Sequence, residues 1–134
     1  MIKIQQENFD IESEINAIKS KHSNIGAVST FLGYVRDINQ DKKVSLIDVE
    51  VYEDMAYHSL KKICNDALNK WNLIDSLVIH RYGQLQIHEK IVLVATFSIH
   101  RNDSFSSCNY IMDFLKKDAH FWKKEFYNKE YKWI

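Results

Sequence analysis

The chain has 134 residues, of which 46% are hydrophobic, 27% charged and 13% aromatic. This length fits one compact domain over residues 1–134, and the high apolar content with zero net charge argues against disorder. Eighteen basic residues balance eighteen acidic ones, so bulk charge disfavours a nucleic-acid partner. No apolar run approaches the ~20 residues of a membrane helix, so no membrane partner is expected.

The first half of the chain alternates short apolar segments with polar ones. An isoleucine period after Asp10, a plausible N-cap, indicates a helix, and alternation of Ile47, Val49 and Val51 with acidic residues indicates a half-buried strand. In chain order we expect a strand at 2–7, a helix at 11–20, a strand at 25–35, a polar loop at 36–43 and a strand at 45–53.

The second half shows clearer helical periods. We expect a helix at 54–71, strands at 74–82 and 90–99, and a helix over 104–119 that Asp103 or Ser104 caps. The apolar stripe of the last helix is expected in the core: Phe105, Cys108, Met112, Leu115 and Ala119. Paired strands between helices favour an α+β fold with a mainly antiparallel sheet and about three helices.

The strong chemical motifs are missing from this sequence. Three scattered glycines cannot form a phosphate loop or a dinucleotide fingerprint, and neither His-Glu-x-x-His nor Cys-x-x-Cys occurs, so we expect no metal and no cofactor. Cys64 and Cys108 are far apart in sequence and are interpreted as reduced thiols. Because the N-terminus also lacks a secretory pattern, we expect a cytoplasmic protein.

Basic residues remain as the candidates for chemistry. They stand where strands end or where the last predicted helix ends, and strand ends can direct side chains toward one ligand: Arg36, His100, Arg101, Lys116, Lys117, Lys123 and Lys124. Arginine and lysine bind phosphate, so these residues suggest an anion site, provided that they surround one cavity. The alternative interpretation is ordinary solvation, with Lys116 covering the core with its methylenes and Arg36 lying in a solvated loop.

Four stretches of the sequence resemble a known family in the family's own order. They cover roughly residues 25–125 and read GAVSTFLGYVRD from Gly26, EVYEDMA from Glu50, HRYGQL from His80, and SIHR from Ser98 with IMDFLK and FWKKE beyond it. Together they are similar to the large, catalytic subunit of molybdopterin synthase. The resemblance implies an α/β hammerhead type of fold.

The resemblance also implies an activity and its partners. Members of that family join with a small ubiquitin-like sulfur carrier whose C-terminal Gly-Gly ends as a thiocarboxylate. They place two sulfurs on cyclic pyranopterin monophosphate and so form molybdopterin, a step of molybdenum cofactor biosynthesis. Their usual assembly is a homodimer of large subunits within a heterotetramer.

The matching positions imply roles for individual residues. Lys116 and Lys123 are implied as catalytic, and Phe31 and Met112 as walls of the channel that admits the carrier tail. Residues implied to bind substrate are Tyr34, Val35, Arg36, His100, Arg101, Lys116, Lys123, Lys124 and Glu125.

Two departures from the family pattern affect local geometry. His120 stands where proline is common, which bears on the placing of Lys123 relative to Lys116, and His88-Glu89 stands where Gly-Asp is usual. Two alternatives to the enzyme remain open. One is a non-catalytic domain that binds a ubiquitin-like carrier tail, and the other is a general phosphate or nucleotide binder.

Overall fold

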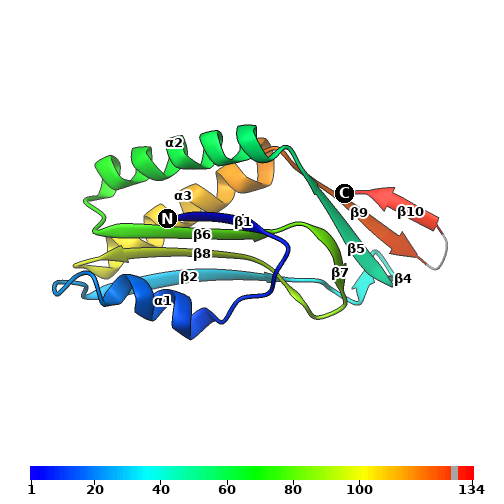
Figure 1. Ribbon diagram of the computed structural model, residues 1–134, viewed down its shortest axis with the longest axis horizontal. Coiled ribbons are helices and arrows are strands. Elements are labelled where there is room, and N and C mark those ends of the chain that lie inside the picture. The colour runs from blue at the N-terminus through cyan, green and yellow to red at the C-terminus, as the bar shows by residue number, and fades with distance from the viewer. Residues whose placement is uncertain (128–129) are drawn as a thin grey trace.

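A four-stranded sheet forms the centre of the molecule (Figure 1). The computed structural model describes residues 1–127 and 130–134. The strands of this sheet, in spatial order, are β1 (Ile2–Gln5), β6 (Asp75–Arg81), β8 (Lys90–Ser98) and β2 (Ala27–Tyr34). Strand β1 pairs with β6 in parallel, whereas β6 with β8 and β8 with β2 are antiparallel.

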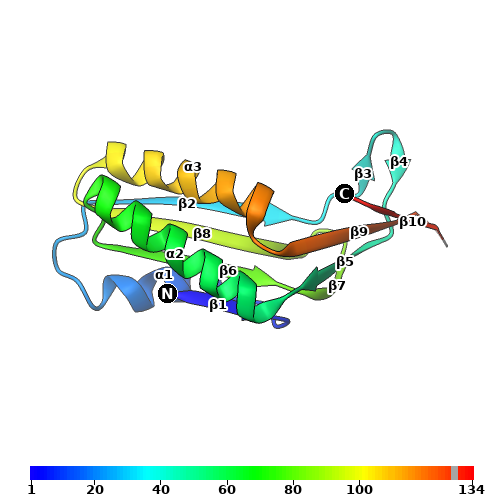
Figure 2. The same cartoon turned by 90° about the horizontal axis from the view of Figure 1, so that it is seen from above.

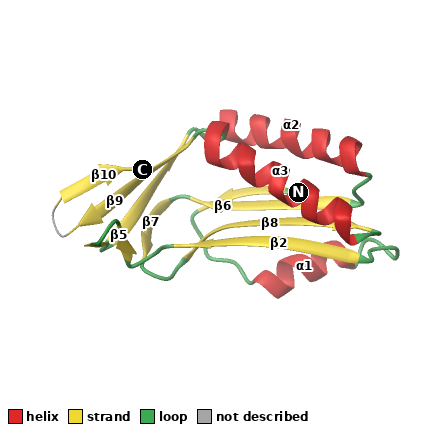
Figure 3. Cartoon of the chain, turned by 180° about the vertical axis from the view of Figure 1, so that it is seen from behind, coloured by secondary structure: helices red, strands yellow, loops and turns green. Residues whose placement is uncertain are grey.

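Helices cover both faces of this sheet. Helices α2 (Glu53–Trp71) and α3 (Arg101–Asp118) lie side by side on one face, and α1 (Ile11–Lys19) lies on the other (Figures 2 and 3). Alternation along the strands supplies an apolar surface to each layer. Leu77 and Ile79 pack in the cluster that includes Ile18 of α1, while Val78 packs with Leu60 of α2.

A second sheet extends from one end of this central unit (Figure 1). Its strands, in spatial order, are β10 (Glu130–Trp133), β9 (Phe121–Tyr127), β5 (Leu46–Val51) and β7 (Gly83–Gln86), all antiparallel. A small hairpin of β3 (Ile38–Asn39) and β4 (Lys42–Lys43) precedes β5. Three chain segments that leave the central unit form the second sheet: β5 lies between β2 and α2, β7 follows β6, and β9 with β10 follows α3.

The predicted fold class is confirmed: the described residues form three helices with mainly antiparallel sheets. The helix caps follow local chemistry. Asp10 Oδ2 accepts the Ser13 N–H at 3.0 Å and begins α1, and Asn72 ends α2 in the left-handed conformation. Within the described residues, no helix is both long and apolar enough to cross a membrane.

The start of α3 differs from the prediction. The helix begins at Arg101, not after Asp103 or Ser104, and its N-cap residue, His100, makes no side-chain capping bond. Ser104 is instead buried against the sheet, where its hydroxyl donates to the Arg101 carbonyl and accepts from Ser29 at 2.8 Å. Because these small hydroxyls are satisfied, the first half of α3 packs a serine-rich face on the sheet.

That packing turns Phe105 away from the core. Phe105 is 65% exposed, so its expected place in the apolar stripe is wrong, whereas Cys108 and Ala119 are buried as expected. The polar loop expected at 36–43 also contains a hairpin, β3–β4, with Gln40 and Asp41 both at positive φ in its turn. Strands β7, β9 and β10 were not predicted.

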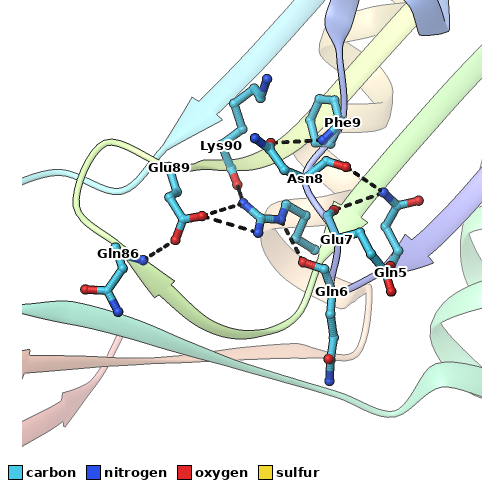
Figure 4. A network of polar contacts seen from close by, with 9 residues as sticks. Gln5, Gln6, Glu7, Asn8, Phe9, Gln86, Glu89 and Lys90 are labelled. Atoms are coloured by element: carbon cyan, nitrogen blue, oxygen red, sulfur yellow. Dashed lines mark hydrogen bonds and ion pairs between the residues drawn. The ribbon is translucent and has the colours of Figure 1, made fainter.

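A buried arginine fastens the turn between β7 and β8 to the N-terminal segment. Arg81 donates through Nε to the Gln6 carbonyl at 3.0 Å and through Nη1 to the Lys90 carbonyl at 2.9 Å and to Glu89 at 3.3 Å. The other Glu89 oxygen accepts the backbone N–H of Gln86 (Figure 4). His88 takes φ 69°, a conformation usual for glycine, so His88-Glu89 still closes the turn.

Candidate functional site

One pocket gathers the residues implied to be catalytic and those implied to form the channel. It has a volume of about 310 Å³ and lies where the end of α3 meets the main sheet and β9. Its lining residues are Phe31, Gly33, Tyr34, His80, Ile91, Val92, Met112, Leu115, Lys116 and Lys123. Volumes of this order are typical of small-molecule sites.

The α3 period supplies one wall of this lysine pocket. Met112, Leu115 and Lys116 lie three and four residues apart, so they share one helix face. Lys116 is exposed and stands in the last helical turn, where its charge also complements the helix dipole. The aliphatic part of the wall therefore ends in an ammonium group.

Strand β9 supplies the second lysine from the opposite direction. Lys123 pairs with Val49 of β5, and alternation places its side chain on the same strand face as Phe121 and the buried Glu125. Burial lowers the pKa of Lys123, because a charged ammonium loses hydration there. The pocket thus pairs an exposed lysine with a desolvated one.

His80 is a buried polar group of this pocket. It is 4% exposed, its ring stacks on Phe121 at a centroid distance of 3.8 Å, and its Nδ1 lies 2.8 Å from the Arg81 carbonyl oxygen. Burial lowers its pKa from 6.5 to about 3, with a smaller contribution from the Lys123 charge. At neutral pH His80 is therefore an uncharged imidazole.

Strand β2 forms the rim of the pocket. Phe31 and Tyr34 are 42% and 47% exposed, and a β-bulge between Gly33 and Tyr34 changes the register with β8. Bulges redirect side chains, and this one brings Tyr34 to the rim beside Phe31 and Gly33. The entrance is consequently lined by aromatic groups.

Four implied substrate-binding residues lie close in sequence to this pocket but outside its lining. Val35 is buried and Arg36 is exposed. Lys124 points to the other face of β9, where it pairs with Glu50 at 3.1 Å and lies over Trp133. Glu125 is 1% exposed and accepts from Asn39 Nδ2 at 2.6 Å, which ties β9 to the β3–β4 hairpin.

His100 and Arg101 lie at the opposite end of the central unit. They begin α3, and Lys116 lies fifteen residues beyond Arg101, or about 22 Å along the axis at 1.5 Å per residue. Antiparallel pairing explains the separation, because Ala27 pairs with Ser98 while Tyr34 pairs with Lys90. The ends of β2 and β8 therefore face opposite ways, and within one chain the expected basic cluster divides in two.

His120 lies in the turn between the end of α3 and the start of β9. It takes φ 62°, which the ring of proline excludes, so the turn here differs from one built on proline. Its carbonyl accepts the Tyr52 N–H at 3.2 Å. Lys116 and Lys123 nevertheless line the same pocket.

Other features of the surface are less suited to an anionic ligand than the lysine pocket is. A larger hollow, about 650 Å³, is lined in part by Glu50, Glu53 and Asp54, whose carboxylates oppose anions. Among the residues that the structure describes, no three His, Cys, Asp or Glu side chains form a metal-binding group. Cys64 and Cys108 are free and buried, and burial raises the pKa of the Cys108 thiol to about 11.

Fold and pocket define an α+β protein suited to hold a small anionic ligand beside two lysines. The chain belongs to the MoaE protein family, which matches residues 4–118. It is 44% identical over 133 residues to a molybdopterin synthase catalytic subunit of Ralstonia nicotianae, covering 99% of this chain and 76% of the relative. The family resemblance drawn from the sequence is thereby confirmed, and this chain is of the enzyme type that these relatives represent.

Solved structures agree with that assignment. A molybdopterin biosynthesis MoaE protein from Burkholderia ambifaria matches with a TM-score of 0.87 at 39% identity, covering all of this chain and 88% of the other. A protein–protein complex of subunits 1 and 2 of molybdopterin-converting factor from Helicobacter pylori matches with a TM-score of 0.81 at 19% identity, covering 97% and 87%. The second likeness concerns the fold alone.

Proposed function

We propose that this protein is the catalytic subunit of a molybdopterin synthase, which transfers sulfur from a thiocarboxylated carrier to cyclic pyranopterin monophosphate. One observation carries the proposal: Lys116 and Lys123 converge on one pocket that Phe31 and Met112 also line. Lysines, aromatic rim and aliphatic wall are the parts that an extended anionic tail and a phosphorylated substrate require.

The two lysines reduce the electrostatic repulsion between the two reactants. The carrier's thiocarboxylate and the substrate's phosphate are both anions, and two unit charges 4 Å apart near a protein surface interact by about 4 kcal/mol. Lys116 stabilises that charge and moves a proton beside the carrier's terminal carbonyl. Lys123, whose pKa burial lowers, assists it or binds the pterin.

Arg36, His100 and Arg101 are proposed to hold the phosphate and the ring, with Tyr34, Val35, Lys124 and Glu125 as further contributors to substrate binding. His100 and Arg101 begin α3 while Lys116 ends it, so they cannot reach this pocket in the same chain. We therefore propose that a second copy supplies them in a homodimer of catalytic subunits, each with one small carrier, as a heterotetramer. The Helicobacter pylori neighbour is itself a complex of two subunits.

The remaining proposals concern the chain as a whole. Residues 1–134 are proposed to act as one domain, since pocket residues come from both sheets. A cytoplasmic location is proposed because both cysteines are free thiols.

A single-turnover assay tests the proposed function. The protein is mixed with cyclic pyranopterin monophosphate and a carrier ending in either a thiocarboxylate or a carboxylate, and molybdopterin is measured. We expect product with the thiocarboxylate alone. Carrier binding without product would support a non-catalytic tail-binding domain, and equal affinity for assorted nucleotides and the pterin would support a general phosphate binder.

A further inference from the structure

His80 presents an acceptor that no described neighbour uses. The Arg81 carbonyl oxygen can only accept, so the Nδ1 atom 2.8 Å from it must carry the imidazole proton. The pKa of the ring, lowered to about 3 by burial, keeps it from taking a second proton at neutral pH. Nε2 therefore holds a lone pair.

That lone pair opens into the lysine pocket. Among the described residues, no buried side-chain nitrogen or oxygen is both sealed from solvent and without a hydrogen-bond partner. The Nδ1 contact is the hydrogen bond found for this ring among those residues, so Nε2 must reach accessible space. The space that the 4% exposed His80 lines is this pocket.

Among the side chains that line the pocket, His80 is the buried one that can accept a hydrogen bond. Lys116 and Lys123 can only donate, and the aliphatic lining offers no polar atom. The Tyr34 hydroxyl can accept, but Tyr34 is 47% exposed at the rim. A ligand that buries an N–H near the lysines must satisfy it, and His80 Nε2 is the buried side-chain acceptor within reach.

We propose that His80 recognises the carrier tail by accepting a hydrogen bond at Nε2 from the backbone N–H of the tail's last glycine. That N–H and the terminal thiocarboxylate belong to one residue, so a tail whose anionic end meets Lys116 and Lys123 places the N–H beside them. The stack on Phe121 fixes the imidazole plane, which keeps Nε2 directed at the pocket. This assignment rests on the proposed function, because it takes the carrier tail as the ligand.

Binding of synthetic peptides tests the assignment without requiring turnover. One peptide ends in Gly-Gly with a free carboxylate, and its partner carries an ester oxygen in place of the last N–H. Affinities are measured by NMR titration for wild type, His80→Asn, which keeps a donor near the Arg81 carbonyl, and His80→Gln, which keeps an acceptor near the Nε2 position. Thermal unfolding verifies that each variant is folded, and His58→Asn is the matched control, since His58 lies outside this pocket.

We expect the ester to bind wild type and His58→Asn about tenfold more weakly than the amide, the size of one hydrogen bond. His80→Asn should bind both peptides alike, and His80→Gln should restore a preference for the amide. If the ester peptide bound more weakly than the amide peptide by the same factor in wild type and in His80→Asn, the assignment would be overturned. Failure of the amide peptide to bind would overturn it as well. Weakened binding of the pterin, but not the peptide, to His80→Asn would also overturn it. A failure of the proposed function would appear separately, as absent turnover with intact peptide binding.

Discussion

The imidazole of His80 lies flat against the ring of Phe121, with centroids 3.8 Å apart and planes inclined by 14°. His80 belongs to β6 of the central sheet and Phe121 to β9 of the second sheet. The contact therefore joins the two sheets at the pocket, two residues before Lys123. A protonated ring at this place would be a buried charge beside a lysine.

Acid should destabilise the protein through His80. Its folded pKa, about 3, lies below its ordinary 6.5, so between these values the unfolded state binds the proton and the folded state does not. The contribution of His80 to the free energy of unfolding is therefore complete above pH 6.5. It decreases by about 1.4 kcal/mol per pH unit as the pH falls from 6.5 toward 3. In His80→Phe this part of the pH dependence should vanish. Urea unfolding between pH 3 and 7 measures it, and an unchanged slope in the variant would contradict the account.

Lys116→Ala should abolish molybdopterin formation while the fold and carrier binding persist. Lys116 is exposed, so its loss should change the free energy of unfolding by less than about 0.5 kcal/mol, while single-turnover rates fall by more than about 100-fold. Lys117→Ala is the matched control, because Lys117 is exposed in the same helical turn but does not line the pocket. Near-normal turnover by Lys116→Ala would refute the role given to this lysine.

The turn at His120 should tolerate glycine but not proline. Its φ of 62° is favourable for glycine and inaccessible to proline, which would have to rebuild the turn between α3 and β9. We expect His120→Pro to destabilise the protein by about 3 kcal/mol and His120→Gly to be neutral or slightly stabilising. Chemical denaturation measures both. A proline variant as stable as wild type would show that the turn adopts a second geometry readily.

The Arg81 network should not accept lysine. The guanidinium of Arg81 donates hydrogen bonds to two backbone carbonyls and to Glu89. The single ammonium group of a lysine cannot donate in all of these directions. We expect Arg81→Lys to cost about 2–4 kcal/mol of unfolding free energy. Lys90→Arg, which leaves the accepting backbone carbonyl in place, serves as control. Comparable stability of Arg81→Lys and wild type would show that these hydrogen bonds contribute little.

Periodicity predicted the elements whose buried face is apolar. Helix α1, strand β5 and helix α2 appear near their expected bounds because Ile18, Val49 and Leu60 mark faces that pack into the core. Strand β9 was not predicted because its inward face carries Lys123 and the buried Glu125 beside Phe121, so no period-2 apolar pattern is visible. Polar residues on an inward face are expected at functional sites.

The part of the site that the family resemblance covers could be predicted from the sequence. The family resemblance indicated Lys116, Lys123, Phe31 and Met112, and the structure gathers these in one pocket. Proximity to strand ends did not place His100 correctly, because β2 and β8 pair antiparallel and their C-terminal ends therefore lie at opposite ends of the sheet. No role was predicted for His80 from the sequence, because its place in the pocket depends on the stack with Phe121 of β9, a strand that was not predicted.

Cyclic pyranopterin monophosphate soaked into crystals of the protein with its carrier tests the central claim most directly. We predict the substrate in the lysine pocket, with polar atoms of its ring system within hydrogen-bond distance of Lys116 and Lys123 and its phosphate toward Arg36 or toward His100 and Arg101 of a second copy. Substrate bound in the acidic hollow lined by Glu50 and Glu53, away from both lysines, would contradict the account.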